Sequence, residues 1–278
     1  MPKKKKKSKL RYVGKAFTYL GKGIYYTGKG GFLASRFVYR KVKNQRQKSK
    51  EKKEQERTEQ LKPKTNAQFA PLQHIETLNG NLKQFESHLF TKDSTIGIIL
   101  GARGSGKSAI GMKLLENFKK KTQKNVYAMG FKNEDLPNWI SVVSNIKEIQ
   151  NDSVILIDEG GITFSSRKSM SNANQLLSQL LFIARHKNLS ILFITQNSSN
   201  LEVNVLRQAD FLILKPSSLL QKDFERKIIS DIYSKVGKGF LDHQNIQGLT
   251  YIHSDKFQGF ISNELPSFWN VKVSKAFK

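Results

Sequence analysis

Short apolar runs alternate with longer amphipathic stretches from about residue 90 to residue 236 of this chain. Runs of this kind, without internal polar residues, are typical of buried strands in a parallel sheet. We predict such strands at residues 96–100, 125–129, 153–157, 189–195 and 211–214. The stretches between them repeat apolar residues at helical spacing, which predicts helices at 110–121, 174–186, 201–208 and 219–236 and a short amphipathic piece at 146–149.

This alternation of strand and helix predicts an α/β fold in which helices flank a mainly parallel sheet. Two further apolar runs, at 249–253 and 257–262, predict a C-terminal hairpin with its turn at Ser254 and Asp255. Residues 72–90 form a lead-in that shows neither period clearly. Its two histidines, His74 and His88, lack the spacing of metal ligands, so we interpret both as ordinary surface or packing residues.

The first predicted strand ends in Gly101-x-x-x-x-Gly106-Lys107-Ser108, the phosphate-binding P-loop pattern. Glycines let the backbone turn tightly and direct its N–H groups at a phosphate, and the N-terminus of the following helix adds partial positive charge. The strand before the loop and the helix after it argue against a chance match in a turn rich in Gly and Ser. We predict that Lys107 reaches the β- and γ-phosphates and that Ser108 holds Mg²⁺. The predicted nucleotide-binding residues are Gly101, Ala102, Arg103, Gly104, Ser105, Gly106, Lys107, Ser108 and Ala109.

The strand at 153–157 leads into Asp158 and Glu159, about fifty residues after the P-loop. An apolar strand that ends in Asp-Glu is a weak signal alone and a strong one at this distance from a P-loop. It resembles a Walker B strand, in which Asp158 would lie in the Mg²⁺ shell and Glu159 would orient or deprotonate the attacking water. Gln196 follows the strand at 189–195. It either contacts the γ-phosphate or its water at the carboxyl edge of the sheet, or only caps its strand.

Composition adds a strong positive charge to this pattern. The 278 residues carry a formal net charge of +26, and residues 1–60 alone carry +16. Such asymmetry favours polyanionic partners, either DNA or an anionic membrane surface, although a solubilising tail has the same composition. The chain has no cysteine, which excludes disulfides, thiolate metal sites and a cysteine nucleophile. No apolar run reaches the roughly 18 residues of a spanning helix, and the lysine-rich N-terminus lacks the apolar segment of a secretory signal.

We divide the chain into a basic N-terminal extension at 1–60, a lead-in at 61–89 and a P-loop domain at 90–278. The extension repeats a Tyr-x-Gly-Lys unit every seven residues from Tyr12, Tyr19 and Tyr26. On a helix, the repeat would form a basic stripe beside a stripe of small residues and an aromatic face. That pattern suits a helix on a membrane surface or against a partner protein, whereas its many glycines suit a disordered basic arm.

The order of these parts is specific: a P-loop, an Asp-Glu strand, a helix that ends in Arg185-His186, and an apolar strand closed by Thr195-Gln196. Over about residues 90–236 the chain resembles the HerA/FtsK superfamily of P-loop ATPases, which includes DNA pumps, viral genome-packaging ATPases and the Zot-like proteins of filamentous phages. The resemblance implies that ATP and Mg²⁺ are cofactors, that the protein forms a homo-oligomeric ring, often a hexamer, and that it moves DNA or assembles a virion. Zot-like phage proteins usually carry a membrane span, so its lack here favours the packaging or translocating branch, or a surface-held variant.

The resemblance also implies an arginine that acts on the ATP of a neighbouring subunit, with Arg185 as the first choice and Arg207 as the second. We expect Arg185 to lie beside the sheet edge where the nucleotide binds; its alternative role is to cap its helix. The expected function is that of a viral or mobile-element ATPase that works on DNA in the cytoplasm. One alternative is a Zot-like assembly or extrusion ATPase, peripheral at a membrane or engaged in virion assembly. The other is a P-loop kinase, which the Asp-Glu pair and the following Thr-Gln strand disfavour.

Overall fold

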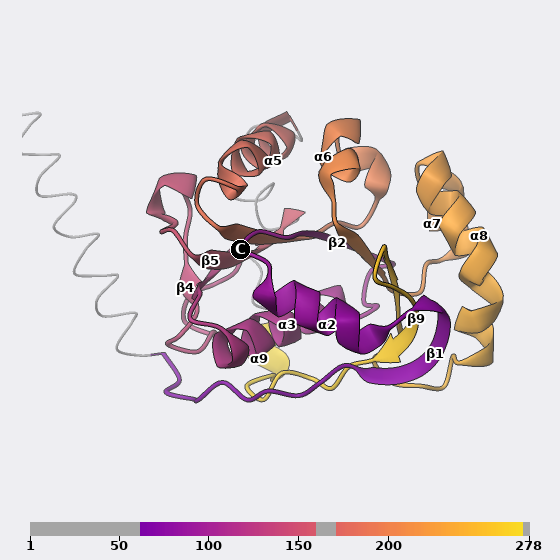
Figure 1. Cartoon of the computed structure of the whole chain (residues 1–278), viewed down its shortest axis with the longest axis horizontal. Helices are drawn as coiled ribbons and strands as arrows, with labels where there is room; N and C mark the ends of the chain where they lie inside the picture. Colours follow the sequence, from indigo (N-terminus) through magenta and orange to yellow (C-terminus); the bar gives the residue numbers. More distant parts are fainter. Residues whose placement is uncertain (1–61, 160–170, 275–278) are drawn as a thin grey trace, which may run out of the picture. The chain divides into compact units, whose positions relative to one another are not determined.

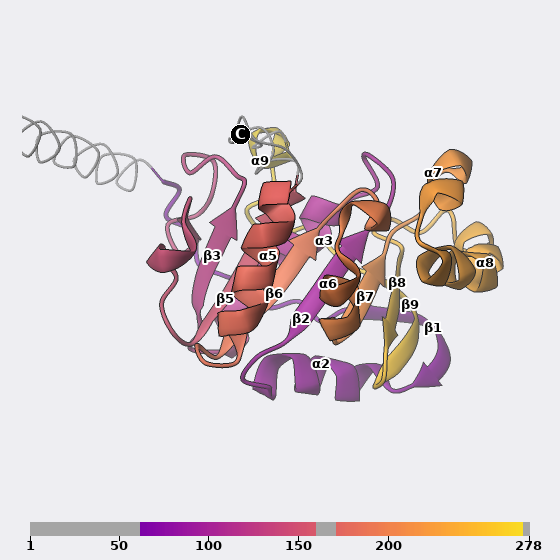
Figure 2. The same cartoon turned by 90° about the horizontal axis from the view of Figure 1, so that it is seen from above.

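The computed structural model describes residues 62–159 and 171–274, which belong to one compact unit. Its centre is a nine-stranded sheet in the order β1-β9-β8-β7-β2-β6-β5-β3-β4 (Figure 2). Strands β7 to β4 of this order are parallel, and β8, β9 and β1 extend the sheet by antiparallel pairing. The parallel strands are β2 (Ile96–Leu100), β3 (Asn125–Met129), β4 (Ser141–Val142), β5 (Ser153–Asp158), β6 (Leu189–Ile194) and β7 (Phe211–Leu214). The antiparallel strands are β1 (Gln73–Gly80), β8 (Thr250–Ser254) and β9 (Phe257–Ser262).

Helices cover both faces of this sheet (Figure 1). One face packs against α5 (Ser171–Ala184), α6 (Val203–Gln208) and α8 (Lys227–Asp242), and the other against α2 (Leu82–Thr91), α3 (Lys107–Lys121) and α9 (Val271–Ser274). The remaining short elements are α7 (Leu219–Phe224) and the 3₁₀ turns η1 (Ile146–Glu148) and η2 (Ser198–Asn200).

The central strand β2 contributes to the apolar core on both faces of the sheet. Ile98 and Leu100 belong to the core beneath α5, whereas Ile99 belongs to the core around α3. Because successive side chains of a strand point to opposite faces, a strand covered on both sides must be apolar at every position. This explains the continuous apolar run that identified the strand, and the predicted α/β fold with a mainly parallel sheet is confirmed.

Two predictions about the C-terminal part are wrong, and the other predicted helices and strands begin and end within three residues of the observed ones. The helix predicted at 219–236 is divided into α7 and α8 around Glu225. The carboxylate of Glu225 is buried and accepts a 2.7 Å hydrogen bond from the backbone N–H of Ser198, so the chain turns inward at this point. The hairpin turn lies at Asp255 and Lys256, one residue later than predicted, because Ser254 is the last residue of β8 and its hydroxyl accepts from the N–H of Phe257.

The lead-in of unclear type contains two elements. Strand β1 pairs with β9 at the edge of the sheet, and α2 follows it after Asn81, whose side chain accepts from the N–H of Gln84. The N-terminal extension and its seven-residue repeat lie outside the described residues, so the division at residues 60 and 89 stays a prediction. Within residues 62–159 and 171–274, none of the helices combines the length and the apolar character needed to cross a bilayer.

A buried carboxylate on α3 joins three segments that are distant in the sequence. Glu116 is fully buried and pairs with Lys113 at 3.1 Å. It also accepts hydrogen bonds from the N–H groups of Gln68 and Ser267, both at 3.1 Å. Removing one partner of a buried ion pair leaves the other charge without compensation.

We therefore expect Glu116→Ala to lower the free energy of unfolding by about 3–5 kcal/mol in urea titrations. A matched control is Glu148→Ala on η1, where the side chain is exposed and the expected change is below about 0.5 kcal/mol. Equal unfolding midpoints for the two variants would contradict the prediction.

Candidate nucleotide-binding site

The sheet register brings the predicted motifs to one edge. Strand β6 lies between β2 and β5, with Ile194 opposite both Ile99 of β2 and Asp158 of β5. The P-loop, which follows β2, therefore begins on one side of the segment that follows β6. Glu159, which follows β5, lies on the other side of that segment. Because these strands are parallel, their carboxyl ends meet at the edge where open α/β sheets bind ligands.

The P-loop backbone depends on its glycines. Gly101, Gly104 and Gly106 have φ angles of 150°, 77° and 90°, in the region that side chains other than glycine rarely adopt. Gly106 is also the N-cap of α3, and its carbonyl accepts the first helical bond, from Ile110 at 3.1 Å. The N–H groups of the first helical turn have no acceptor within the helix, so they are available to an anion.

The Lys107 side chain folds over the loop. Its ammonium donates to the carbonyl oxygens of Gly101 at 2.8 Å and Ala102 at 2.9 Å. Burial lowers the pKa of this ammonium, and the nearby Asp158 carboxylate opposes the shift. The ammonium therefore already lies at the loop. A bound phosphate would replace these two carbonyls as its hydrogen-bond acceptor.

Two serines and an arginine are the other polar residues of the loop. The Ser105 hydroxyl is buried and has no hydrogen-bond partner within residues 62–159 and 171–274, which leaves it available to a ligand. Ser108 lies half-buried in the first turn of α3. The Arg103 side chain is exposed, as expected for the apex of the loop.

The Asp-Glu pair at the end of β5 is buried, with Asp158 7% and Glu159 8% exposed. Burial raises the pKa of Glu159, and hydrogen bonds from the Thr195 side chain, the Asn200 side chain and the Gln196 backbone oppose this shift. These donors hold the carboxylate at the end of β6. The sequence did not indicate that Thr195 and Asn200 contact Glu159. For Thr195, the polar Thr-Gln end of an otherwise apolar strand was a signal that could have suggested it.

The oxygen ligands at this edge fit a magnesium ion. Ser108 offers a hydroxyl and Asp158 a carboxylate, the hard ligands that Mg²⁺ prefers. Within the described residues, no three His, Cys, Asp or Glu side chains form a complete metal cage. Mg²⁺ needs none, because it commonly binds one or two protein ligands together with substrate phosphates and water.

A family comparison agrees with this arrangement. Residues 95–212 match the family model described as zonular occludens toxin (Zot). That stretch runs from the start of β2 into β7 and holds the P-loop, the Asp-Glu pair and Gln196. The chain contains a P-loop NTPase domain, and residues 95–212 of it are similar to the Zot family.

Solved structures of two other proteins are similar to parts of this chain. The genome-packaging NTPase B204 from Sulfolobus turreted icosahedral virus 2, bound to AMPPCP, is 17% identical and aligns with 62% of this chain and 99% of its own, at a TM-score of 0.42. EssC (ATPases 2 and 3) from Geobacillus thermodenitrificans is 15% identical and aligns with 77% of this chain and 50% of its own, at a TM-score of 0.44. No curated protein matches the chain.

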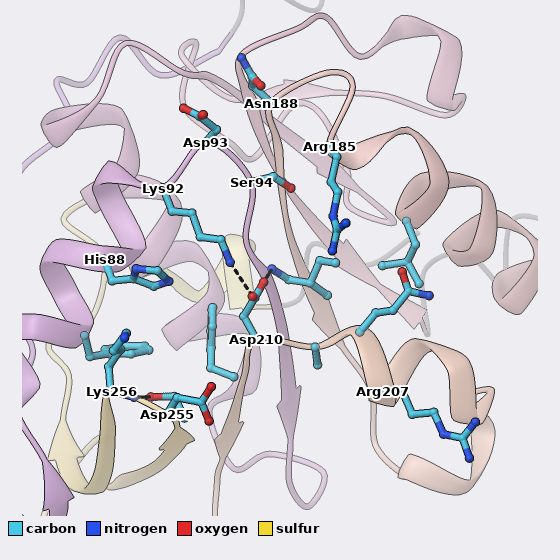
Figure 3. Close-up of a pocket in the computed structure, with 17 residues that line it drawn as sticks. His88, Lys92, Asp93, Ser94, Arg185, Asn188, Arg207, Asp210, Asp255 and Lys256 are labelled. Carbon is cyan, nitrogen blue, oxygen red and sulfur yellow. Dashed lines mark hydrogen bonds and ion pairs between the residues drawn. The ribbon is translucent and has the colours of Figure 1, made fainter.

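The two arginines considered for action on a neighbouring ATP lie at the other edge of the P-loop domain. Arg185 and Arg207 line a cavity of about 840 Å³ together with Ile96 and Phe211, the first residues of β2 and β7 (Figure 3). The expectation that Arg185 lies beside the nucleotide edge of its own subunit is therefore wrong. The physical reason is that α5 returns the chain from the carboxyl edge of β5 to the amino edge of β6, so its last residues lie where β6 begins.

The same cavity contains an ion pair, in which Lys92 and Asp210 lie 2.7 Å apart. The second Asp210 oxygen accepts from the N–H of Ile96 at 2.7 Å, which ties the carboxylate to the start of β2. In Figure 3 the Arg185 guanidinium points into the cavity and the Arg207 guanidinium points away from it. A role on a neighbouring ATP stays a prediction for both, and it requires this edge to face the nucleotide edge of another subunit.

Proposed function

We propose that this protein is a Mg²⁺-dependent ATPase that assembles as a homo-oligomeric ring and uses hydrolysis to move DNA. The observation that carries hydrolysis is the position of Glu159. It is a buried carboxylate one residue beyond Asp158, at the same sheet edge as the P-loop lysine, and three donors orient it. A protein that only bound nucleotide would not need a carboxylate in this position.

The residues divide the chemistry among them. Lys107 and the first-turn N–H groups of α3 bind the phosphates, and Ser108 and Asp158 would hold the metal. When bound, Mg²⁺ neutralises charge on the phosphates. Glu159 orients the attacking water and accepts its proton, and Gln196, which is exposed after β6, would contact the same water.

The charge of the chain supports DNA as the moved partner. Residues 61–278 carry +10, in addition to +16 in the N-terminal extension. A basic protein binds polyanions through counterion release, so its affinity falls steeply with salt. The Zot match keeps protein extrusion at a membrane as the second candidate.

The deciding experiment measures the ATPase rate with and without Mg²⁺ and with and without double-stranded DNA, together with native mass. We expect hydrolysis to require Mg²⁺, DNA to stimulate it, and the active species to be an oligomer. Stimulation by anionic liposomes but not by DNA would favour the extrusion candidate. Transfer of phosphate to an acceptor other than water would support the kinase alternative.

Removal of residues 1–60 provides a separate test of the N-terminal extension. The sheet begins at Gln73, and the truncation keeps Lys62, which is 3% exposed and donates to the carbonyl of Ile140 at 2.8 Å. We therefore expect a folded protein with its basal ATPase rate.

Binding to DNA or anionic liposomes should weaken by about tenfold or more at low salt, with a shallower salt dependence, because +16 of charge is removed. A truncated protein that fails to fold, seen by circular dichroism, would show that the extension packs into the core. Unchanged binding to both DNA and anionic liposomes would show that residues 61–278 make the contact.

A further inference from the structure

Lys215 follows β7 directly and lies against the P-loop. Its backbone N–H donates to the carbonyl of Leu100 at 2.8 Å, and the carbonyl of Pro216 accepts from the N–H of Ala102 at 3.1 Å. A Cβ atom placed on Gly101 would lie only 2.5 Å from the Cβ of Lys215. The start of the P-loop is therefore packed directly on this lysine.

The side chain of Lys215 is 1% exposed, although it ends in an ammonium group. The ammonium donates to the carbonyls of Gly248 at 2.9 Å and Leu249 at 3.2 Å, and to the side-chain oxygen of Asn263 at 3.1 Å. These three oxygens match its three protons. They come from the segments before β8 and after β9, and none carries a formal charge. Among the described residues, no carboxylate forms an ion pair with it.

The ammonium lies close to the start of α3. A Cβ placed on Gly106 would be 3.8 Å from the Cε of Lys215 and 3.9 Å from its Nζ. The N-terminus of a helix carries partial positive charge, which disfavours a cation there and favours an anion. Burial lowers the pKa of Lys215 to about 7. A buried cation lies beside the phosphate-binding turn, and neutral oxygens alone compensate it.

Among the described residues, few other ionisable groups lie near Lys215. On the P-loop side, Lys107 bonds the carbonyl of Gly101. On α8, the Tyr233 hydroxyl donates to the backbone carbonyl of Lys215 at 3.0 Å, and burial raises the pKa of that hydroxyl, with Glu225 adding to the shift. The segments around residues 248 and 263 present only neutral oxygens to the ammonium.

We propose that Lys215 is a positioning residue of the nucleotide site, a buried cation that stabilises bound polyphosphate from behind the P-loop and ties the loop to the C-terminal hairpin. The inference rests on the proposed function, since it needs a nucleotide at this edge. Lys215 acts through the field of its charge and through the loop that packs on it, because all three of its protons already have acceptors.

Nucleotide binding and the protonation of Lys215 are thermodynamically linked. A negatively charged ligand favours the protonated ammonium, so nucleotide binding raises the pKa of Lys215 above its value in the free protein. Binding is then strengthened below the free pKa of about 7, and this gain is lost as the pH rises through the higher pKa of the bound state. The same linkage requires net proton uptake on binding near neutral pH.

The test compares the affinity for a non-hydrolysable ATP analogue at pH 6 and pH 9 in wild type, Lys215→Met and Lys215→Gln. Gln keeps hydrogen-bond donors without the charge. At pH 6 both variants should bind about tenfold more weakly, which corresponds to a shift of about one pKa unit, and at about pH 9 they should match wild type. Calorimetry in buffers of different ionisation enthalpy should show proton uptake by wild type, which requires no variant.

Lys124→Met is the matched control. Lys124 is also partly buried with a lowered pKa, and it donates to the carbonyl of Asn188 at 3.0 Å and the hydroxyl of Ser190 at 3.2 Å, at the opposite edge of the sheet. Its replacement should leave the affinity and its pH dependence unchanged.

Several outcomes would overturn the proposal. Full affinity of Lys215→Gln for the analogue at pH 6 would mean that Lys215 only supplies hydrogen bonds. An equal loss of affinity at pH 6 and pH 9 would contradict a role for the charge, as would the absence of proton uptake by wild type. Failure of wild type to bind the analogue at any pH would instead contradict the proposed function, and it is seen without any variant. If both Lys215 variants fail to fold, the absence of proton uptake by wild type still overturns the proposal.

Discussion

Glu159→Gln protein is expected to bind ATP as wild type does and to hydrolyse it about 10²–10⁴-fold more slowly, the range attributed to a positioned general base. The amide keeps the size and shape of the side chain, and its oxygen can still accept from Thr195, so we expect the fold of the site to be kept. It cannot take a proton from water. The measurements are single-turnover hydrolysis and equilibrium binding of ATP.

Lys107→Ala is the matched counterpart at the same site. This variant lacks the ammonium at the P-loop, so we expect it to lose ATP binding itself. The pH profile gives an independent check. Because burial raises the pKa of Glu159, wild-type kcat/KM should fall on the acid side at a higher pH than an ordinary glutamate would give. A Glu159→Gln protein that turns over at the normal rate would remove Glu159 from the mechanism.

Arg185→Ala is expected to lower the hydrolysis rate of the assembled protein by about 10³–10⁵, the range measured for arginines supplied to a neighbouring phosphoryl group. Within residues 62–159 and 171–274, Lys107 donates to the P-loop carbonyls and no arginine side chain does, so the charge that develops on the transferred group would call for an arginine from a neighbouring subunit. Arg185 lies in a cavity at the opposite edge of its own sheet, so it can act only on another subunit. Mixing tests this. Arg185→Ala and Lys107→Ala proteins, each inactive alone, should regain partial activity when assembled together.

Lys256→Ala is the control for this prediction, because Lys256 is a cation that lines the same cavity, and its loss should leave the rate unchanged. No recovery in mixtures that demonstrably co-assemble would count against action across an interface. Full activity of Arg185→Ala alone would exclude it, and the same experiment would then be made with Arg207.

The local sequence determined most of the parallel half of the domain. Strands β2, β3 and β7 begin and end at the predicted residues. Their apolar runs are unbroken because both faces of the sheet are covered, and such runs are visible without any partner. The P-loop and the Asp-Glu pair were equally readable, because their chemistry requires fixed residue types at a fixed spacing next to a strand.

Tertiary structure decided the features that depend on distant partners. Strand β1 is mostly exposed, so its sequence shows little alternation of apolar and polar residues. Its partner β9 lies near the other end of the domain in the sequence. Arg185 was assigned to the wrong edge because the direction of a crossover helix is set by the sheet that it joins. Lys215 reads as an ordinary lysine after a strand, yet it is 1% exposed. Its burial arises because the P-loop packs on it and three oxygens from the segments flanking β8 and β9 close around its ammonium, contacts that exist only once the chain has folded.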